Sequence, residues 1–123
     1  MNENATIVPL ERMCRVQGSG PATVNIEGKS HPFTVEVLQY LSLLGTGPEN
    51  AISISDFVAQ PGIALIPVTA EMYVGGLHYL NLIGVIKGSD GKPHRFFRTE
   101  LANRAEYTIG PSLTYIPEKA IHR

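Results

Sequence analysis

Positively charged side chains are distributed very unevenly along this chain of 123 residues. Residues 30–86 contain no lysine or arginine, and their four carboxylates give a formal charge of −4. Residues 87–104 contain five such cations and two carboxylates, a formal charge of +3. The cations are Lys87, Lys92, Arg95, Arg98 and Arg104, and His94 lies among them. So local a concentration of positive charge indicates a surface that meets an anionic partner.

Other reactive side chains form no pattern that predicts catalysis. The single cysteine and the four histidines have neither Cys-x-x-Cys nor His-x-x-x-His spacing, so no metal site is expected. The glycine pairs at 18–20 and 45–47 lack the pattern of a phosphate-binding loop and are interpreted as turns. No two carboxylates are spaced in a way that requires acid–base chemistry. We therefore expect neither an enzyme nor a cofactor.

The composition is that of one globular domain. Hydrophobic residues make up 43% of the chain and charged residues 17%, and the net charge is −1. This net charge argues against a protein that binds nucleic acid over its whole surface. The pattern of a signal peptide and an apolar stretch long enough to span a bilayer are both missing from the sequence. A single cysteine fits a reducing compartment, so a cytoplasmic protein without membrane contact is expected.

The elements that must position the cations begin after a segment rich in glycine, proline and serine. Residues 1–32 are predicted to be a partly ordered N-terminal arm, although the alternation in 22–26 could form a strand. A helix is predicted over 33–45, since apolar residues follow Val37 at the spacing of one helical face. Ser53 is predicted to cap a short second helix that ends at the Pro-Gly pair 61–62.

A third helix is predicted over 69–84, with Gly75 and Gly76 in its middle. Glycine destabilises a helix interior, so the pair indicates either close packing against another helix or a ligand that approaches the backbone. From Gly84 the hydrophobic period becomes that of strands. The Asp90-Gly91 turn predicts a hairpin, a bend follows at 101–104, and a further strand is expected at 106–109. Residues 111–123 form a C-terminal tail.

This order of elements resembles the winged helix-turn-helix superfamily of bacterial transcriptional regulators. The residues that carry the likeness are Leu77, Leu80 and Ile83-Gly84-Val85-Ile86, followed by the Asp90-Gly91 turn and the strand Glu106-Tyr107-Thr108-Ile109. The likeness covers residues 33–110. It implies an α+β fold in which three helices precede a wing of two to three antiparallel strands, with residues 1–32 as an irregular arm.

The resemblance also implies where DNA would bind. The third helix of such a domain enters the major groove, and here its outward residues would be Thr69, Met72, Gly75 and His78, together with Glu71 and Tyr79. These positions hold no arginine, lysine, asparagine or glutamine, the side chains that make bidentate contacts with purine edges. The wing would therefore supply most of the affinity, through Lys87, Lys92, His94, Arg95, Arg98 and Arg104.

Three functions follow as alternatives. The first is a small winged-helix regulator that binds double-stranded DNA through its basic wing and forms a homodimer, with the 1–32 arm or the C-terminal tail as the expected contact. The second is a winged-helix module that does not bind DNA. It docks on a protein partner through an apolar face of the charge-poor third helix, formed by Met72, Val74, Gly75 and Gly76. A third is a protein that binds single-stranded nucleic acid through the wing, with Phe96 and Phe97 stacking on bases. The cations could also serve only to keep an exposed hairpin soluble.

Overall fold

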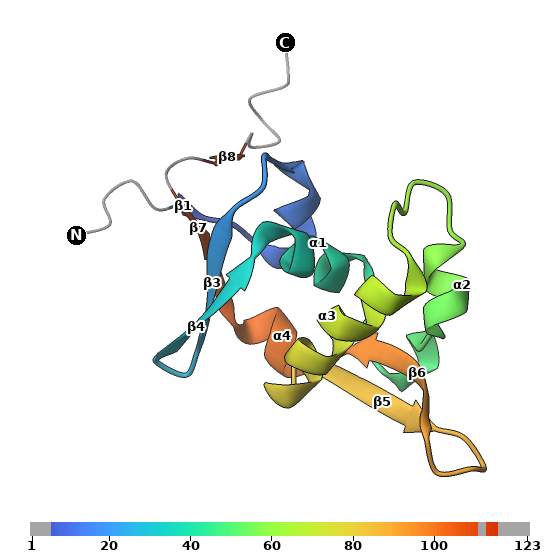
Figure 1. Cartoon of the computed structure of the whole chain (residues 1–123). Coiled ribbons are helices and arrows are strands. Elements are labelled where there is room, and N and C mark those ends of the chain that lie inside the picture. Colours follow the sequence, from blue (N-terminus) through green and yellow to red (C-terminus); the bar gives the residue numbers. More distant parts are fainter. Residues whose placement is uncertain (1–5, 111–112, 116–123) are drawn as a thin grey trace. The chain divides into compact units, whose positions relative to one another are not determined.

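The computed structural model describes residues 6–110 and 113–115 of the chain (Figure 1). Helices and antiparallel sheets make the fold α+β, as the sequence predicts. The chain forms two compact units, Met1–Leu43 with Ala105–Arg123, and Leu44–Arg104. We call the first the sheet unit and the second the hairpin unit, and describe each by itself. Within the described residues, no helix is long and apolar enough to cross a membrane.

The sheet unit contains a four-stranded antiparallel sheet in the order β1-β7-β3-β4. Its strands are β1 (Thr6–Ile7), β3 (Pro21–Ile26), β4 (Lys29–Thr34) and β7 (Glu106–Ile109). Strand β3 is central, since it pairs with both β4 and β7. A two-residue turn joins β3 to β4, with Glu27 and Gly28 at positive φ, which suits a tight hairpin. The remaining strands, β2 (Val16–Gln17) and β8 (Thr114–Tyr115), pair separately.

The core of the sheet unit comes from alternate strand residues and from two helices. The 3-10 helix η1 (Leu10–Arg15) and the α-helix α1 (Val35–Leu43) each bury an apolar face. Ala22 and Val24 on β3 are buried together with Tyr107 and Ile109 on β7, as expected for residues two apart on a strand. The Gln39 side-chain amide donates to the backbone carbonyls of Met13 and Val16, 3.3 Å from each. Helix α1 is thereby tied to the end of η1.

The N-terminal segment differs from the irregular arm that we expected for 1–32. The strand expected at 22–26 is present as β3, but η1, β1, β2 and most of β4 also lie in this segment. Pro32 belongs to β4, where it faces Thr23, and not to the first turn of a helix. The helix expected over 33–45 accordingly begins later, at Val35. Residues 29–34 form a strand because they pair with β3. Such pairing depends on residues outside the short stretch of sequence from which the helix was predicted.

The hairpin unit begins with helices that match the sequence pattern. In α2 (Ile54–Val58) the Ser53 side chain accepts a hydrogen bond from the Asp56 backbone N–H at 3.1 Å, the expected N-cap. Helix α3 (Pro67–Tyr79) starts with proline in its first turn and buries Ala70, Val74 and Leu77. It ends earlier than predicted, since Asn81 has a positive φ of 64° and the strand already begins at Ile83.

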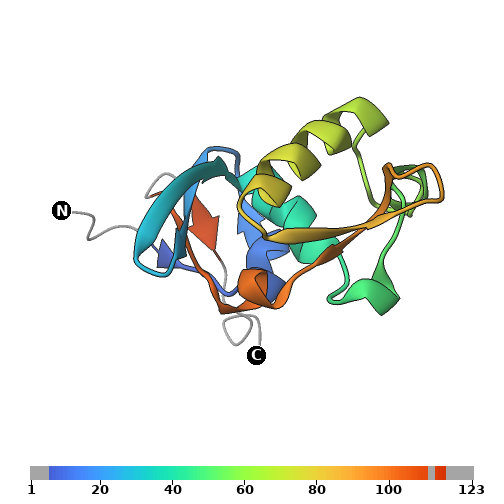
Figure 2. The same cartoon turned by 90° about the horizontal axis from the view of Figure 1, so that it is seen from below.

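The predicted hairpin is present as β5 (Ile83–Lys87) and β6 (Pro93–Arg98), beside α3 in Figure 2. Residues 45–52, which precede α2, lie along the edge of β6 that β5 does not occupy. Ile52 and Phe96 exchange both backbone hydrogen bonds, at 3.0 and 2.9 Å, and the Arg98 N–H donates to the Gly45 carbonyl at 2.8 Å. The 3-10 helix η2 (Pro48–Asn50) lies between these contacts. Strand β6 is therefore paired on both edges.

The predicted bend at 101–104 is the short helix α4 (Glu100–Arg104). The Thr99 hydroxyl accepts a hydrogen bond from the Ala102 N–H at 3.3 Å, which caps its first turn. The strand expected at 106–109 exists as β7, but it pairs with β1 and β3 in the sheet unit. A third wing strand at this position is therefore wrong, and β5 and β6 form a two-stranded sheet. The C-terminal tail expected at 111–123 lies mostly outside the described residues.

Candidate functional site

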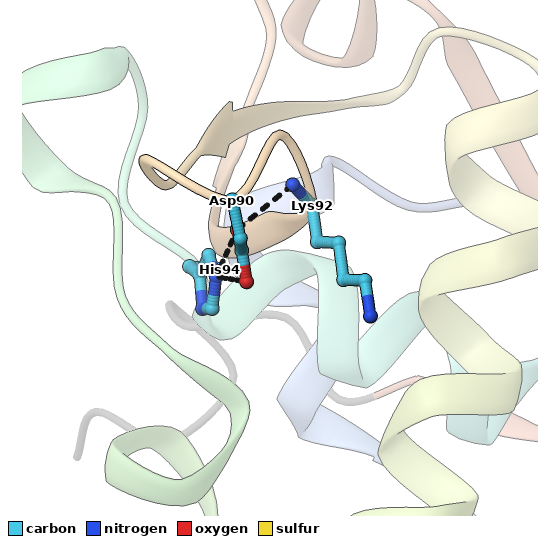
Figure 3. A network of polar contacts seen from close by, with 3 residues as sticks. All are labelled: Asp90, Lys92 and His94. Carbon is cyan, nitrogen blue, oxygen red and sulfur yellow. Dashed lines mark hydrogen bonds and ion pairs between the residues drawn. The ribbon is translucent and has the colours of Figure 1, made fainter.

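The turn of the β5–β6 hairpin is organised by one carboxylate. Asp90 accepts a hydrogen bond from the Lys92 backbone N–H at 3.0 Å, and its oxygens lie 2.8 and 3.0 Å from His94 Nε2 (Figure 3). Gly91, at φ 78°, allows the chain to reverse. The Gly88 N–H then closes the turn by donating to the Lys92 carbonyl at 2.9 Å. The position of His94 is thereby fixed across the turn.

The same contacts set the protonation of this carboxylate. The Lys92 backbone N–H, followed by the His94 side chain, lowers the pKa of Asp90 below its ordinary value. Asp90 therefore stays ionised next to the His94 ring, and the pair offers a phosphate less net positive charge than a histidine alone would. Among the predicted DNA-binding residues, His94 therefore stabilises the hairpin turn through its contact with Asp90.

Three of the predicted cations lie exposed on this hairpin, namely Lys87, Lys92 and Arg95. Lys87 ends β5 beside a bulge, and Lys92 immediately precedes β6. Arg98 differs, because it is half-buried and its Nε donates to the Thr46 hydroxyl at 3.2 Å. Arg104 is exposed but belongs to α4, outside the hairpin. The exposed positive charge of the hairpin is therefore concentrated in three side chains.

The two phenylalanines of β6 have structural surroundings. Phe96 is buried, and Phe97 is half-buried and pairs across the strands with Gly84. A methyl group added at Gly84 would overlap the Phe97 ring, so this glycine leaves the space that the ring occupies. Neither ring is presented as an open platform on which a base could stack.

The outward face of α3 is apolar. Val68, Met72 and Tyr79 are 57%, 71% and 85% exposed. Of the other predicted residues, Thr69 is half-buried, whereas Gly75 and His78 are exposed. Val74 is buried, so an exposed docking face on this helix does not include it. The helix therefore presents large apolar side chains to solvent, in a place where a DNA-reading helix presents hydrogen-bonding ones.

The surroundings of Gly75 distinguish the two explanations given for a glycine in the middle of this helix, close packing and an approaching ligand. A methyl group added there would meet no atom within 4 Å, so close packing inside this chain does not account for the glycine. The substitution of alanine by glycine in a helix interior costs roughly 0.5–1 kcal/mol. Because no described residue packs against this position to compensate that cost, Gly75 marks a surface where an outside group can approach the backbone.

A pocket of about 550 Å³ lies between α2, α3 and the hairpin. Its apolar wall comes from all three elements and includes Val74 and Phe96. The polar residues of its lining are Ser53, Ser55, Glu71, His78 and His94. The structure thus brings three predicted site residues together here, Gly75, His78 and His94. The exposed cations and Met72 are not part of the lining.

Sequence reasoning missed two contributors to this region. Glu71, expected only on the outward face of the helix, lines the pocket, and the Asp90 carboxylate is hydrogen-bonded to His94 in the turn. An available signal for the apolar face was its spacing, since positions 68, 72, 75 and 79 lie on one side of a helix.

Away from the hairpin and the pocket, the described residues contain no further cluster of reactive side chains. Cys14 is exposed, with its Sγ 3.4 Å from the Ser42 hydroxyl oxygen. Over residues 6–110 and 113–115, no group of three or more histidine, cysteine, aspartate or glutamate side chains could hold a metal ion. Comparison with known proteins gave no match, either to a family model, to a curated protein or to a solved structure.

Proposed function

We propose that this chain is a small winged-helix regulator that binds double-stranded DNA through the β5–β6 hairpin. The observation that carries the proposal is the exposure of Lys87, Lys92 and Arg95 on one hairpin. The Asp90 carboxylate in that hairpin is already engaged by His94 and the Lys92 N–H. Three accessible cations on a projecting turn suit contact with successive phosphates.

The order of elements in the hairpin unit supports the same proposal. The resemblance implies helices that lead directly into a hairpin wing. Here α2 and α3 precede the β5–β6 hairpin, and Ile52 pairs with Phe96 on the outer edge of β6. In this proposal β5–β6 takes the place of the wing and α3 that of the third helix.

Helix α3 would contribute little sequence readout. Its exposed face lacks side chains that make bidentate contacts with a base, and Glu71 would repel phosphate. Thr69 and His78 can donate single hydrogen bonds, and Met72 can contact a thymine methyl group. The expected binding is therefore dominated by phosphate contacts and falls steeply with salt.

Fluorescence polarisation with a labelled duplex tests the proposal. At about 50 mM salt we expect binding whose logarithm falls with log salt at a slope of about −3, for about three phosphate contacts. Replacing Lys87, Lys92 and Arg95 together by alanine should weaken binding by roughly 10- to 100-fold and bring the slope close to zero. Lys29→Ala is the matched control, since Lys29 is exposed at the other hairpin. Absence of binding by the unaltered protein at this salt concentration would refute the proposal.

The apolar face of α3 supports a second function, contact with another protein. Exposed methionine and tyrosine side chains are typical of the centre of protein interfaces and not of a DNA-reading helix. This function is compatible with DNA binding by the wing, because the three exposed cations belong to the hairpin and the apolar face belongs to α3.

A further inference from the structure

The apolar face of α3 is a continuous stripe. At 100° per residue, Val68, Met72, Gly75 and Tyr79 fall within an arc of about 60°. The three large side chains are more than half exposed, and Gly75 lies between them with open space above it. Val68 and Tyr79 form the two ends of the stripe. In its middle, Met72 projects beside the gap at Gly75, so a partner surface can fit against both features.

We propose that this stripe pairs with the same stripe of a second copy of the chain, with the two α3 helices antiparallel about a twofold axis. In an antiparallel pair centred between positions 73 and 74, position 72 faces position 75 and position 68 faces position 79. Met72 then lies over Gly75 of the partner subunit, and Tyr79 lies over Val68 of the partner subunit. Met72 thus meets a glycine and Tyr79 meets the smaller Val68, and the contact at the glycine lets the helices approach closely.

The polar residues beside the stripe fit the same arrangement. Glu71 and His78 lie on the same flank of α3, since both line the pocket. In the proposed pair Glu71 is displaced by only about 3 Å along the axis from His78 of the partner subunit. A histidine N–H can donate to a carboxylate, so this flank carries two symmetry-related hydrogen-bonding pairs. The stripe is therefore self-complementary in both size and polarity.

This self-complementarity favours a second copy over other occupants. Duplex DNA would meet no cation on the stripe, together with one carboxylate beside it. The stripe places Met72 opposite Gly75 when it meets its own reverse, whereas this match is not built into the surface of an unrelated protein. The glycine in mid-helix, unexplained by packing within the chain, is what close approach of a second helix requires.

The inference goes beyond the proposed DNA contact and changes it, because pairing occupies Met72 and His78 and leaves only the hairpins to meet DNA. The flank with Glu71 and His78 shares its pocket with Pro93 and His94 of the hairpin. A twofold axis perpendicular to both helices keeps this flank of each copy on one side of the pair. Both hairpins then lie on that side, and their six exposed cations form one surface.

Sedimentation velocity of the full chain without DNA tests the pairing, over concentrations from about 1 µM to about 500 µM, a range suited to a small interface. We expect a monomer–dimer equilibrium that Met72→Glu weakens by at least about tenfold. Ile66→Glu is the matched control, because Ile66 is an apolar residue, 62% exposed, that precedes α3 as its N-cap and does not belong to the stripe. Circular dichroism checks that both variants are folded.

Two further variants probe the register. Gly75→Leu, which fills the gap opposite Met72, should weaken the dimer about as much as Met72→Glu. Glu71→Lys should weaken it less, and adding His78→Glu to that variant should restore it. A monomer at every concentration, or equal effects of Met72→Glu and Ile66→Glu, would refute the pairing. DNA binding is measured separately, so loss of either property can be assigned without the other.

Discussion

The two hairpins of this protein have similar turns but different surfaces. In β3–β4 the Asn25 side chain accepts a hydrogen bond from the Gly28 N–H, and in β5–β6 Asp90 does the same for Lys92. Residues 21–34 carry one glutamate and one lysine, whereas residues 83–98 carry four cations and one carboxylate. Since a stable hairpin does not need this excess charge, the excess in β5–β6 supports the proposed contact with an anionic partner.

Burial separates the two hairpins as well. Strand β3 is paired on both edges within a four-stranded sheet and buries Ala22 and Val24, whereas β6 buries only Phe96 along its length. The sheet hairpin thus contributes to a core, and the basic hairpin exposes most of its side chains. Substitutions should therefore affect stability in the first and binding in the second.

The largest difference is expected between two aromatic residues. Tyr107, buried opposite Val24 in the sheet, should cost about 3–5 kcal/mol of unfolding free energy when replaced by alanine. The half-buried Phe97 of the basic hairpin should cost only about 1–1.5 kcal/mol. Urea unfolding followed by circular dichroism measures both. Equal losses would show that the basic hairpin is as much a part of a core as the sheet.

Alkaline pH should destabilise the sheet unit through one buried phenol. Burial raises the pKa of Tyr40 to about 12, above the ordinary value near 10. The neutral form is favoured in the folded state, so stability is complete below about pH 10 and is lost as pH rises toward 12. The loss amounts to roughly 2–3 kcal/mol.

Urea unfolding between about pH 9 and pH 12 follows this effect. Tyr40→Phe should remove most of the decrease, whereas Tyr79→Phe, at an exposed position of α3, should leave it unchanged. An unaltered decrease in Tyr40→Phe would assign the alkaline instability to another group.

The smallest effect distinguishes a glycine of each hairpin. Gly84→Ala places a methyl group where the Phe97 ring lies and should cost about 1–3 kcal/mol. Gly28→Ala meets no atom within 4 Å but must adopt φ 88°, which should cost about 1 kcal/mol. Phe97→Ala should cancel the cost of Gly84→Ala and leave that of Gly28→Ala unchanged. Additive costs of Gly84→Ala and Phe97→Ala in the double variant would contradict the steric explanation.

Local signals in the sequence predict much of the hairpin unit. Ser53 caps α2 as expected, the α3 helix begins near its proline, and the Asp90-Gly91 turn joins two strands. These features depend on residues a few positions apart, which a sequence displays directly. The same reasoning fails for β4 and β7, because their partner β3 lies elsewhere in the chain.

The candidate site was harder to predict for a related reason. Helix α3 has apolar residues on both faces, and periodicity alone does not decide which face is covered. Leu77 on the predicted inner face is buried, but Val68, Met72 and Tyr79 remain exposed. The engagement of His94 by Asp90 and of Arg98 by Thr46 likewise arises from side chains that meet only after folding.

Gly75 and Gly76 have a consequence for the dynamics of α3. Both are exposed in mid-helix, so the isolated helix loses backbone order more easily than one with alanine at these positions. If a second copy covers them, its binding also stabilises the helical conformation, so dimerisation and the local ordering of α3 are coupled. The exchange rates of the α3 amide hydrogens, and the midpoint of thermal unfolding, would then depend on protein concentration.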